Sequence, residues 1–225
     1  MNPLAVVGDA WRLYSEHWRR FSAIGLAIFA VVAVIGLLLG LAGTFGVFVT
    51  QIFVLAGSVV LAGAVVTTVE RLRRDGAETS VAEAIGSTRG VFWTLLAAGI
   101  LAGIGIGIGL VLFIFPGVVL ATFWWVIAPC IVLERTGVLG AFGRSMRLVR
   151  RQGWATFGVL ALTWVVMILA GLVVAIVLGG LPPFLAGFIA TLIQGAFFAP
   201  FAAIAVTLTY FRLAELPDVS LRRRR

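Results

Sequence analysis

The sequence contains no lysine, one histidine and one cysteine, and these absences exclude several kinds of site. Cys130, the single cysteine, has no second thiol with which to form a disulfide or a redox pair. His17, the single histidine, stands beside Trp18 with no second histidine, whereas a metal site requires several suitable ligands. We therefore expect neither a metal nor any other cofactor.

Charged side chains are missing from most of the chain. None of the 17 arginines and 9 acidic residues falls within three apolar blocks, residues 21–69, 90–133 and 152–211. Each block is more than twice as long as the ~20 helical residues that cross a bilayer core of ~30 Å. Because the chain is also 62% hydrophobic, with a mean hydropathy of +1.16, the composition excludes an ordinary soluble domain. The sequence predicts an all-α integral membrane protein, and no charged catalytic group is available within its spans.

The blocks divide into six transmembrane helices arranged as three hairpins, in a single membrane domain of residues 1–225. The turns are expected near Gly43, at Pro116-Gly117 and at residues 181–183, and none of them contains arginine. Because arginine in short loops marks the cytoplasmic side, we expect a multi-pass protein of the bacterial cytoplasmic membrane with both termini in the cytoplasm. The predicted spans are residues 21–41, 47–69, 92–115, 118–133, 154–178 and 184–211, followed by a basic tail at 212–225.

A short amphipathic helix is predicted before each hairpin, at residues 3–18, 80–90 and 138–151. In the first, Leu4, Trp11 and Tyr14 share one apolar face, and in the second Ser80 and Glu83 have the spacing of a capping box. Helices of this kind lie in the interface plane with their apolar side toward the lipid. We interpret the three units as a degenerate threefold repeat. The alternative is that any amphipathic helix ending at a membrane has this pattern.

Eight arginines are the strongest candidates for a binding role, because a guanidinium group pairs bidentately with phosphate. We expect them to bind anionic lipid headgroups or a membrane or cytoplasmic partner protein, and the alternative is a solvated cluster that only sets the topology. The net charge of +8 has the same explanation, so no nucleic-acid partner is expected. The eight residues are Arg144, Arg147, Arg150, Arg151, Arg222, Arg223, Arg224 and Arg225.

Two prolines lie inside predicted spans, and each is expected to bend its helix because it removes one backbone hydrogen bond. Bent helices line the substrate sites of many transporters. We therefore predict an intramembrane groove at Pro129, Gln194, Pro200 and Trp164. For Gln194 the alternative is an interhelical hydrogen bond, and for Trp164 it is packing in the core.

Glycines spaced four residues apart form two rows in the third predicted span, a pattern that lets neighbouring helix backbones approach closely. The same glycine-rich run does not follow a strand, so a dinucleotide-binding loop is not supported. The rows permit a homo-oligomer without requiring one. The residues predicted to serve helix packing are Gly99, Gly103, Gly105, Gly107 and Gly109.

The chain resembles a known family over most of its 225 residues, and several short motifs carry the likeness. These are Pro116-Gly117 with the following Val-Val-Leu, then Pro129 and Glu134, and the runs at residues 140–141 and 145–149. They resemble the membrane domain associated with bacterial glycerophosphoryl diester phosphodiesterases and its stand-alone relatives. The resemblance implies the membrane fold. In that family the hydrolase is a separate soluble barrel whose acidic and histidine residues bind metal and phosphate, and nothing in this sequence corresponds to it.

Two hypotheses for function follow from the sequence. In the first, the chain is a non-enzymatic scaffold, anchor or accessory factor that binds lipid headgroups or a partner protein at the cytoplasmic face. In the second, it is an uncoupled carrier or a flippase-like transporter of an apolar or amphipathic small molecule or lipid, and uses the bent fourth and sixth spans. Ion coupling is disfavoured because no charged residue lies within the spans.

Overall fold

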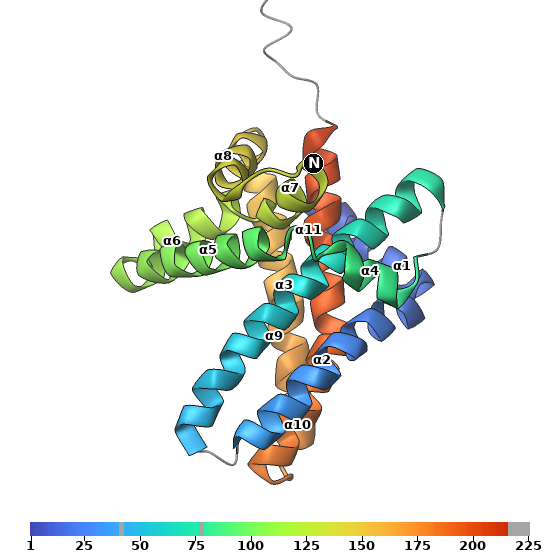
Figure 1. Cartoon of the computed structure of the whole chain (residues 1–225). Helices are drawn as coiled ribbons and strands as arrows, with labels where there is room; N and C mark the ends of the chain where they lie inside the picture. Colours follow the sequence, from blue (N-terminus) through green and yellow to red (C-terminus); the bar gives the residue numbers. More distant parts are fainter. Residues whose placement is uncertain (41–42, 77–78, 216–225) are drawn as a thin grey trace, which may run out of the picture.

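A computed structural model describes residues 1–40, 43–76 and 79–215, and this part of the chain folds into helices without any strand (Figure 1). Six helical segments in it are long and apolar enough to cross a membrane, which confirms an all-α, multi-pass membrane protein. The elements are α1 (Pro3–Glu16), α2 (Trp18–Gly40), α3 (Gly43–Asp75), α4 (Val81–Ser87), α5 (Phe92–Leu112), α6 (Ile114–Phe123), α7 (Ile127–Glu134), α8 (Val138–Val149), α9 (Gly153–Leu178), α10 (Pro183–Ile193), the π-helix η1 (Gln194–Phe198) and α11 (Ala199–Ala214).

The helix boundaries differ from the predicted ones mainly at two points. Helix α3 continues past the apolar block to Asp75. Charged side chains are compatible with a helix, so the helix can extend beyond the hydrocarbon. The turn predicted at Pro116-Gly117 is wrong, since the chain reverses at Phe113, whose φ of −155° and ψ of 135° are extended. Pro116 instead lies in the first turn of α6, where the missing N–H would have had no partner anyway.

The main bundle consists of α2, α3, α9 and the continuous run of α10, η1 and α11 (Figure 1). Its core is filled by Phe21, Ile24, Leu61 and Ile204, each at most 2% exposed. A second apolar cluster joins α5, α7 and α8 to the end of α11. The start of α1 and the end of α11 lie at one end of this bundle, and the α9–α10 connection lies at the other.

Helices α5 and α6 pair with each other and project sideways from the main bundle (Figure 1). At the tip of this pair, Phe113 and Phe115 are 74% and 77% exposed, and Val111 is even more exposed. A surface of this kind is too large and too apolar to face water. The pair therefore requires hydrocarbon or another apolar surface around it.

Helix α2 crosses the π-helix η1 with almost no space between the two backbones. A Cβ atom added at Gly25 would lie well inside van der Waals contact with the Gly195 carbonyl oxygen, and 3.1 Å from Pro200 Cγ. A Cβ atom added at Gly195 would come within 2.6 Å of the ring of Phe29. Only glycine at both positions permits this approach, which holds η1 against the core.

A helix, α1, covers most of the residues predicted for the first interfacial helix, and it packs against α9 and α11. Val6, Ala10 and Tyr14 are its buried residues, whereas Leu4 and Trp11 are 69% and 62% exposed. The apolar residues of α1 therefore divide between two faces, one held by the protein and one free to contact lipid.

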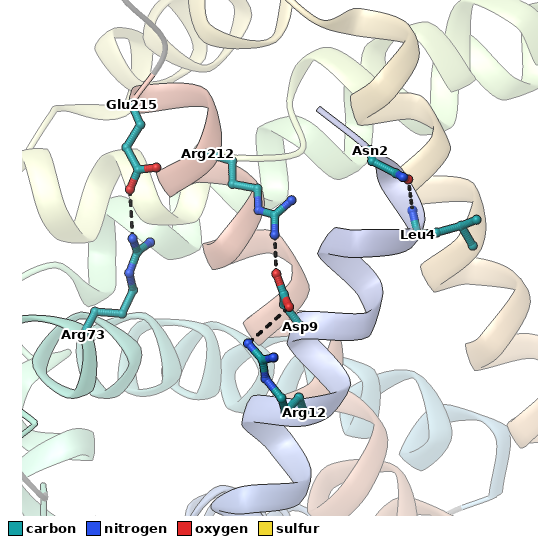
Figure 2. Close-up of polar contacts among 7 residues, drawn as sticks. All are labelled: Asn2, Leu4, Asp9, Arg12, Arg73, Arg212 and Glu215. Carbon is teal, nitrogen blue, oxygen red and sulfur yellow. Dashed lines mark hydrogen bonds and ion pairs between the residues drawn. The ribbon is translucent and has the colours of Figure 1, made fainter.

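Ion pairs tie together the end of the bundle where α1 and α11 meet. Figure 2 shows the Asp9 carboxylate between the guanidinium groups of Arg12 and Arg212, with Arg12 3.4 Å away. Beside them, Arg73 of α3 pairs with Glu215 at 2.8 Å and also stacks over the ring of Phe211. The end of α11 is thus connected to both α1 and α3. Because these pairs are largely exposed, each contributes little stability by itself.

The predicted capping box is present at the start of α4. The Ser80 hydroxyl accepts a hydrogen bond from the Glu83 backbone N–H, and the Glu83 carboxylate accepts one from the Ser80 backbone N–H. The bond from the Ser80 backbone N–H, followed by a second that the Ser80 hydroxyl donates to the same carboxylate, lowers the pKa of the Glu83 carboxyl below its usual value. The capping box thus begins α4 at Val81.

Candidate functional site

The principal cavity is a groove of about 950 Å³ in the side of the main bundle. Its walls are α9 from Thr163 to Leu178, α10 from Pro183 to Ala190, and the run from Gln194 to Val206, and α3 contributes residues around Leu61. Trp125, from the junction between α6 and α7, also lines it. The volume is near the upper end of the 300–1,000 Å³ typical of small-molecule sites. We call this cavity the lateral groove.

The lateral groove has few polar groups, and Gln194 supplies the only side-chain amide among the described residues that line it. Among the described residues that line it, none is charged. The hydroxyl of Ser58 donates to the Val54 carbonyl oxygen, and that of Thr163 donates to the Val159 carbonyl oxygen, each at 2.8 Å. The side-chain amide of Gln194 is exposed and forms no hydrogen bond with any described residue. The alternative interpretation, an interhelical hydrogen bond from the Gln194 amide, is therefore not seen among the described residues.

The position of Gln194 follows from the proline that comes six residues later. Pro200 has no N–H to donate to the Ala196 carbonyl, and the helix adopts the wider π form over residues 194–198. The Tyr14 hydroxyl lies 3.5 Å from this carbonyl oxygen and 3.0 Å from the hydroxyl of Ser22. Burial raises the pKa of Tyr14, so its hydroxyl stays protonated and can donate. Helix α1 therefore contacts η1 through Tyr14, at a carbonyl whose residue does not line the groove.

The second predicted bend is also present, between α6 and α7. The α-helix is interrupted at residues 124–126, just before Pro129, and this interruption brings Trp125 to the lateral groove. The ring of Trp124 packs instead against Phe142, with the two ring centroids 4.8 Å apart. Among the described residues, neither indole N–H has a hydrogen-bond partner.

Two of the four residues predicted for the groove line it. Trp164 is 56% exposed within its wall, and Gln194 is the first residue of the π-helix η1. Pro129 and Pro200 are buried and do not line the groove, because each acts through the helix interruption that precedes it. The sequence therefore identified the bent helices, but neither proline itself faces the groove, whereas Trp125 and Gln194, which precede them, do.

The two predicted glycine rows have different surroundings. Cβ atoms added at Gly105 and Gly109 would meet Trp124 at 2.7 Å and the Gly117 backbone at 2.8 Å, so this row packs against α6 and its junction with α7. Cβ atoms added at Gly103 and Gly107 would meet nothing within 4 Å, and at Gly99 only an ordinary contact with Val59. Within the described structure, close packing thus uses one row.

Not all of the arginines predicted to bind headgroups are available for binding, because Arg144 is paired with an acidic residue. Both carboxylate oxygens of Glu134 accept hydrogen bonds from Nε of Arg144 at 2.8 Å, and one of them also accepts from the hydroxyl of Tyr210 at 2.7 Å. The hydrogen bond to Glu134 raises the pKa of the Arg144 guanidinium, which therefore remains charged. Arg147 and Arg150 are exposed on α8 and at its end, and Arg151 is half-buried. Residues 222–225 lie outside the described part of the chain.

Comparison with protein-family models, curated proteins and solved structures finds no match to this chain. The site must therefore be interpreted from its own chemistry. Among the described residues, no group of three histidine, cysteine or acidic side chains is placed to hold a metal ion. What remains is an apolar groove with one free amide, and an arginine-rich surface at the end of the bundle where α1, α8 and α11 lie.

Two contacts between distant segments could not be predicted from local spacing. Gly25 and Gly195 belong to different spans, so no local spacing indicates that they meet. The same holds for Glu134, Arg144 and Tyr210, which come from α7, α8 and α11. A single acid at the very end of an apolar block was the one available signal, because a carboxylate placed there needs a partner.

Proposed function

We propose that this protein is a non-enzymatic component of the bacterial cytoplasmic membrane that holds an apolar or amphipathic molecule in the lateral groove. The observation that carries the proposal is the groove itself, which has about 950 Å³ of space and no charged residue in the described lining. Such a site suits a lipid or a lipid-like small molecule. Such a groove is compatible with a protein that only binds the molecule and with an uncoupled carrier that transports it.

The arginine-rich end of the bundle is proposed to face the cytoplasm, with α1, α4 and α8 at the membrane interface. This places both termini in the cytoplasm, in agreement with the bias of arginine toward that side. Trp11, Trp18, Trp93 and Trp154 are all exposed, as expected for side chains at the level of the headgroups.

A second element of the proposal is that exposed arginines attract anionic lipid to this end. Arg147 and Arg150 are the exposed members, whereas Arg144 is already paired with Glu134. Near an anionic leaflet each basic residue contributes ~1 kcal/mol. A partner protein that binds the same surface is the other occupant this arrangement allows.

A bulky side chain in the groove wall should remove the bound molecule. Gly171 lies in the α9 wall, and a Cβ atom added there would meet nothing within 4 Å, so Gly171→Trp should fill the groove without disturbing the core. The measurement is native mass spectrometry of the protein released from nanodiscs made with bacterial lipids. We expect the wild type to retain lipid and Gly171→Trp to retain several-fold less.

Gly103→Trp is the matched control, because Gly103 is equally unobstructed but lies on α5 outside the groove. It should retain lipid like the wild type.

In the same measurement, the double variant Arg147→Gln, Arg150→Gln should lose anionic lipid selectively, and the difference from the wild type should be larger at low salt. Equal lipid retention by Gly171→Trp and the wild type would refute the groove proposal, and unchanged anionic lipid would refute the role of the arginines.

A further inference from the structure

The Gln194 amide is the only side-chain amide among the described residues that line the lateral groove, and it lies deep in the predicted membrane. The other side-chain donors of that lining without a partner are the indole N–H groups of Trp125 and Trp164. It follows Pro183, at the start of the span, by eleven residues, which is about 16 Å of helix. A polar group in hydrocarbon costs several kcal/mol when it has no partner. The hydroxyls of Ser58 and Thr163 already donate to their own helices, so neither offers a donor to Gln194. The amide is therefore available to an occupant of the groove.

We infer that the occupant is a neutral lipid whose only polar atoms are carbonyl or hydroxyl oxygens, one of which binds the Gln194 amide. This inference rests on the proposed function and specifies the chemistry of its ligand. An amide can donate to a carbonyl or exchange a hydrogen bond with a hydroxyl, and either contact satisfies it. The remainder of the lining is apolar and accommodates the hydrocarbon part of such a molecule.

Charge complementarity argues against an ionised headgroup at this position. No described residue of the lining carries a positive charge, so a phosphate drawn into the groove would have no counter-ion. The desolvation of an unpaired charge costs far more than that of a carbonyl group. A charged phospholipid therefore keeps its headgroup at the interface and leaves Gln194 unsatisfied. An uncharged lipid can move deeper into the hydrocarbon, so that one of its oxygen atoms reaches the Gln194 amide.

The test compares two lipids that differ only by the charged headgroup. A diacylglycerol and a phosphatidylglycerol with identical acyl chains, each carrying a photoreactive diazirine, are added to the protein in nanodiscs. Irradiation should attach the diacylglycerol to residues 163–206 several-fold more than the phosphatidylglycerol. Gln194→Leu should lower the diacylglycerol yield about threefold to fivefold, the value of one intramembrane hydrogen bond, and leave the other lipid unchanged.

Gln51→Leu provides the matched control, since Gln51 is also an exposed amide of an apolar helix but lies outside the groove. It should not alter either yield. Equal yields of the two lipids, unaffected by Gln194→Leu but lowered by Gly171→Trp, would overturn the preference for a neutral lipid and keep the groove. Absence of cross-links between residues 163 and 206 for both lipids would instead overturn the proposed function.

Discussion

Replacing Gly25 with alanine should destabilise the protein by about 3 kcal/mol, the upper part of the range that overpacking costs. The added methyl group would overlap the carbonyl of Gly195, with 2.9 Å between the new Cβ and the carbonyl carbon. Backbone atoms cannot rotate away as a side chain does, so α2 and η1 must separate. Separation would open the core around Phe21 and Ile24 and lower stability further. The measurement is the free energy of unfolding in mixed micelles.

Gly103→Ala is the control that adds the same methyl group where nothing lies within 4 Å. It should be neutral or stabilising by up to ~1 kcal/mol, because alanine favours a helix over glycine. Gly195→Ala should resemble Gly25→Ala, since its Cβ would meet the Phe29 ring. Equal stability of Gly25→Ala and Gly103→Ala would show that the close crossing of α2 and η1 does not exist.

Replacing Glu134 with alanine should lower the free energy of unfolding by about 2 kcal/mol. The change leaves the Arg144 guanidinium without its counter-charge and the Tyr210 hydroxyl without its acceptor. Breaking a fully buried ion pair costs 3–5 kcal/mol, but here the two side chains are 36% and 25% exposed, so water offsets part of the loss. Because the three residues come from α7, α8 and α11, loss of the contact should loosen that end of the bundle.

Glu215→Ala is the matched control for this prediction. Glu215 forms an ion pair of the same length with Arg73, but its side chain is 63% exposed. Its removal should cost less than ~1 kcal/mol. A double-mutant cycle with Arg144→Gln then isolates the Glu134–Arg144 coupling. Identical losses for Glu134→Ala and Glu215→Ala would contradict the special role of the Glu134 cluster.

The fold could be predicted to the extent that hydrophobicity decides it. The exclusion of charge from hydrocarbon located six apolar helices, and the prolines located their interruptions before Pro129 and Pro200. Neither signal contains information on which helices touch. The turn at Phe113 and the sideways projection of α5 and α6 therefore could not be foreseen, since Pro116 is compatible with both a turn and the start of a helix.

The candidate site was predictable where the chemistry is local. Gln194 stands out because a deep amide needs a partner, and Trp164 because it is a large ring far from the interface. The sequence could not separate Gly105 and Gly109, which pack against a neighbour, from Gly103 and Gly107, which do not, because both rows have the same spacing. The sequence also could not indicate that the charge of Arg144 is paired with that of Glu134, because the two residues meet only through the packing of α7 against α8.

Spin-label accessibility at the wall of the lateral groove distinguishes a groove that faces hydrocarbon, as proposed, from one that holds water. Trp164→Cys, in a background with Cys130→Ala, carries the label in the groove, and Arg150→Cys carries it on the arginine-rich end. In nanodiscs, oxygen should collide with the label at 164 far more often than a water-soluble nickel complex does, with the reverse at 150. Equal access of the nickel complex to both positions would mean a water-filled groove and would contradict the account.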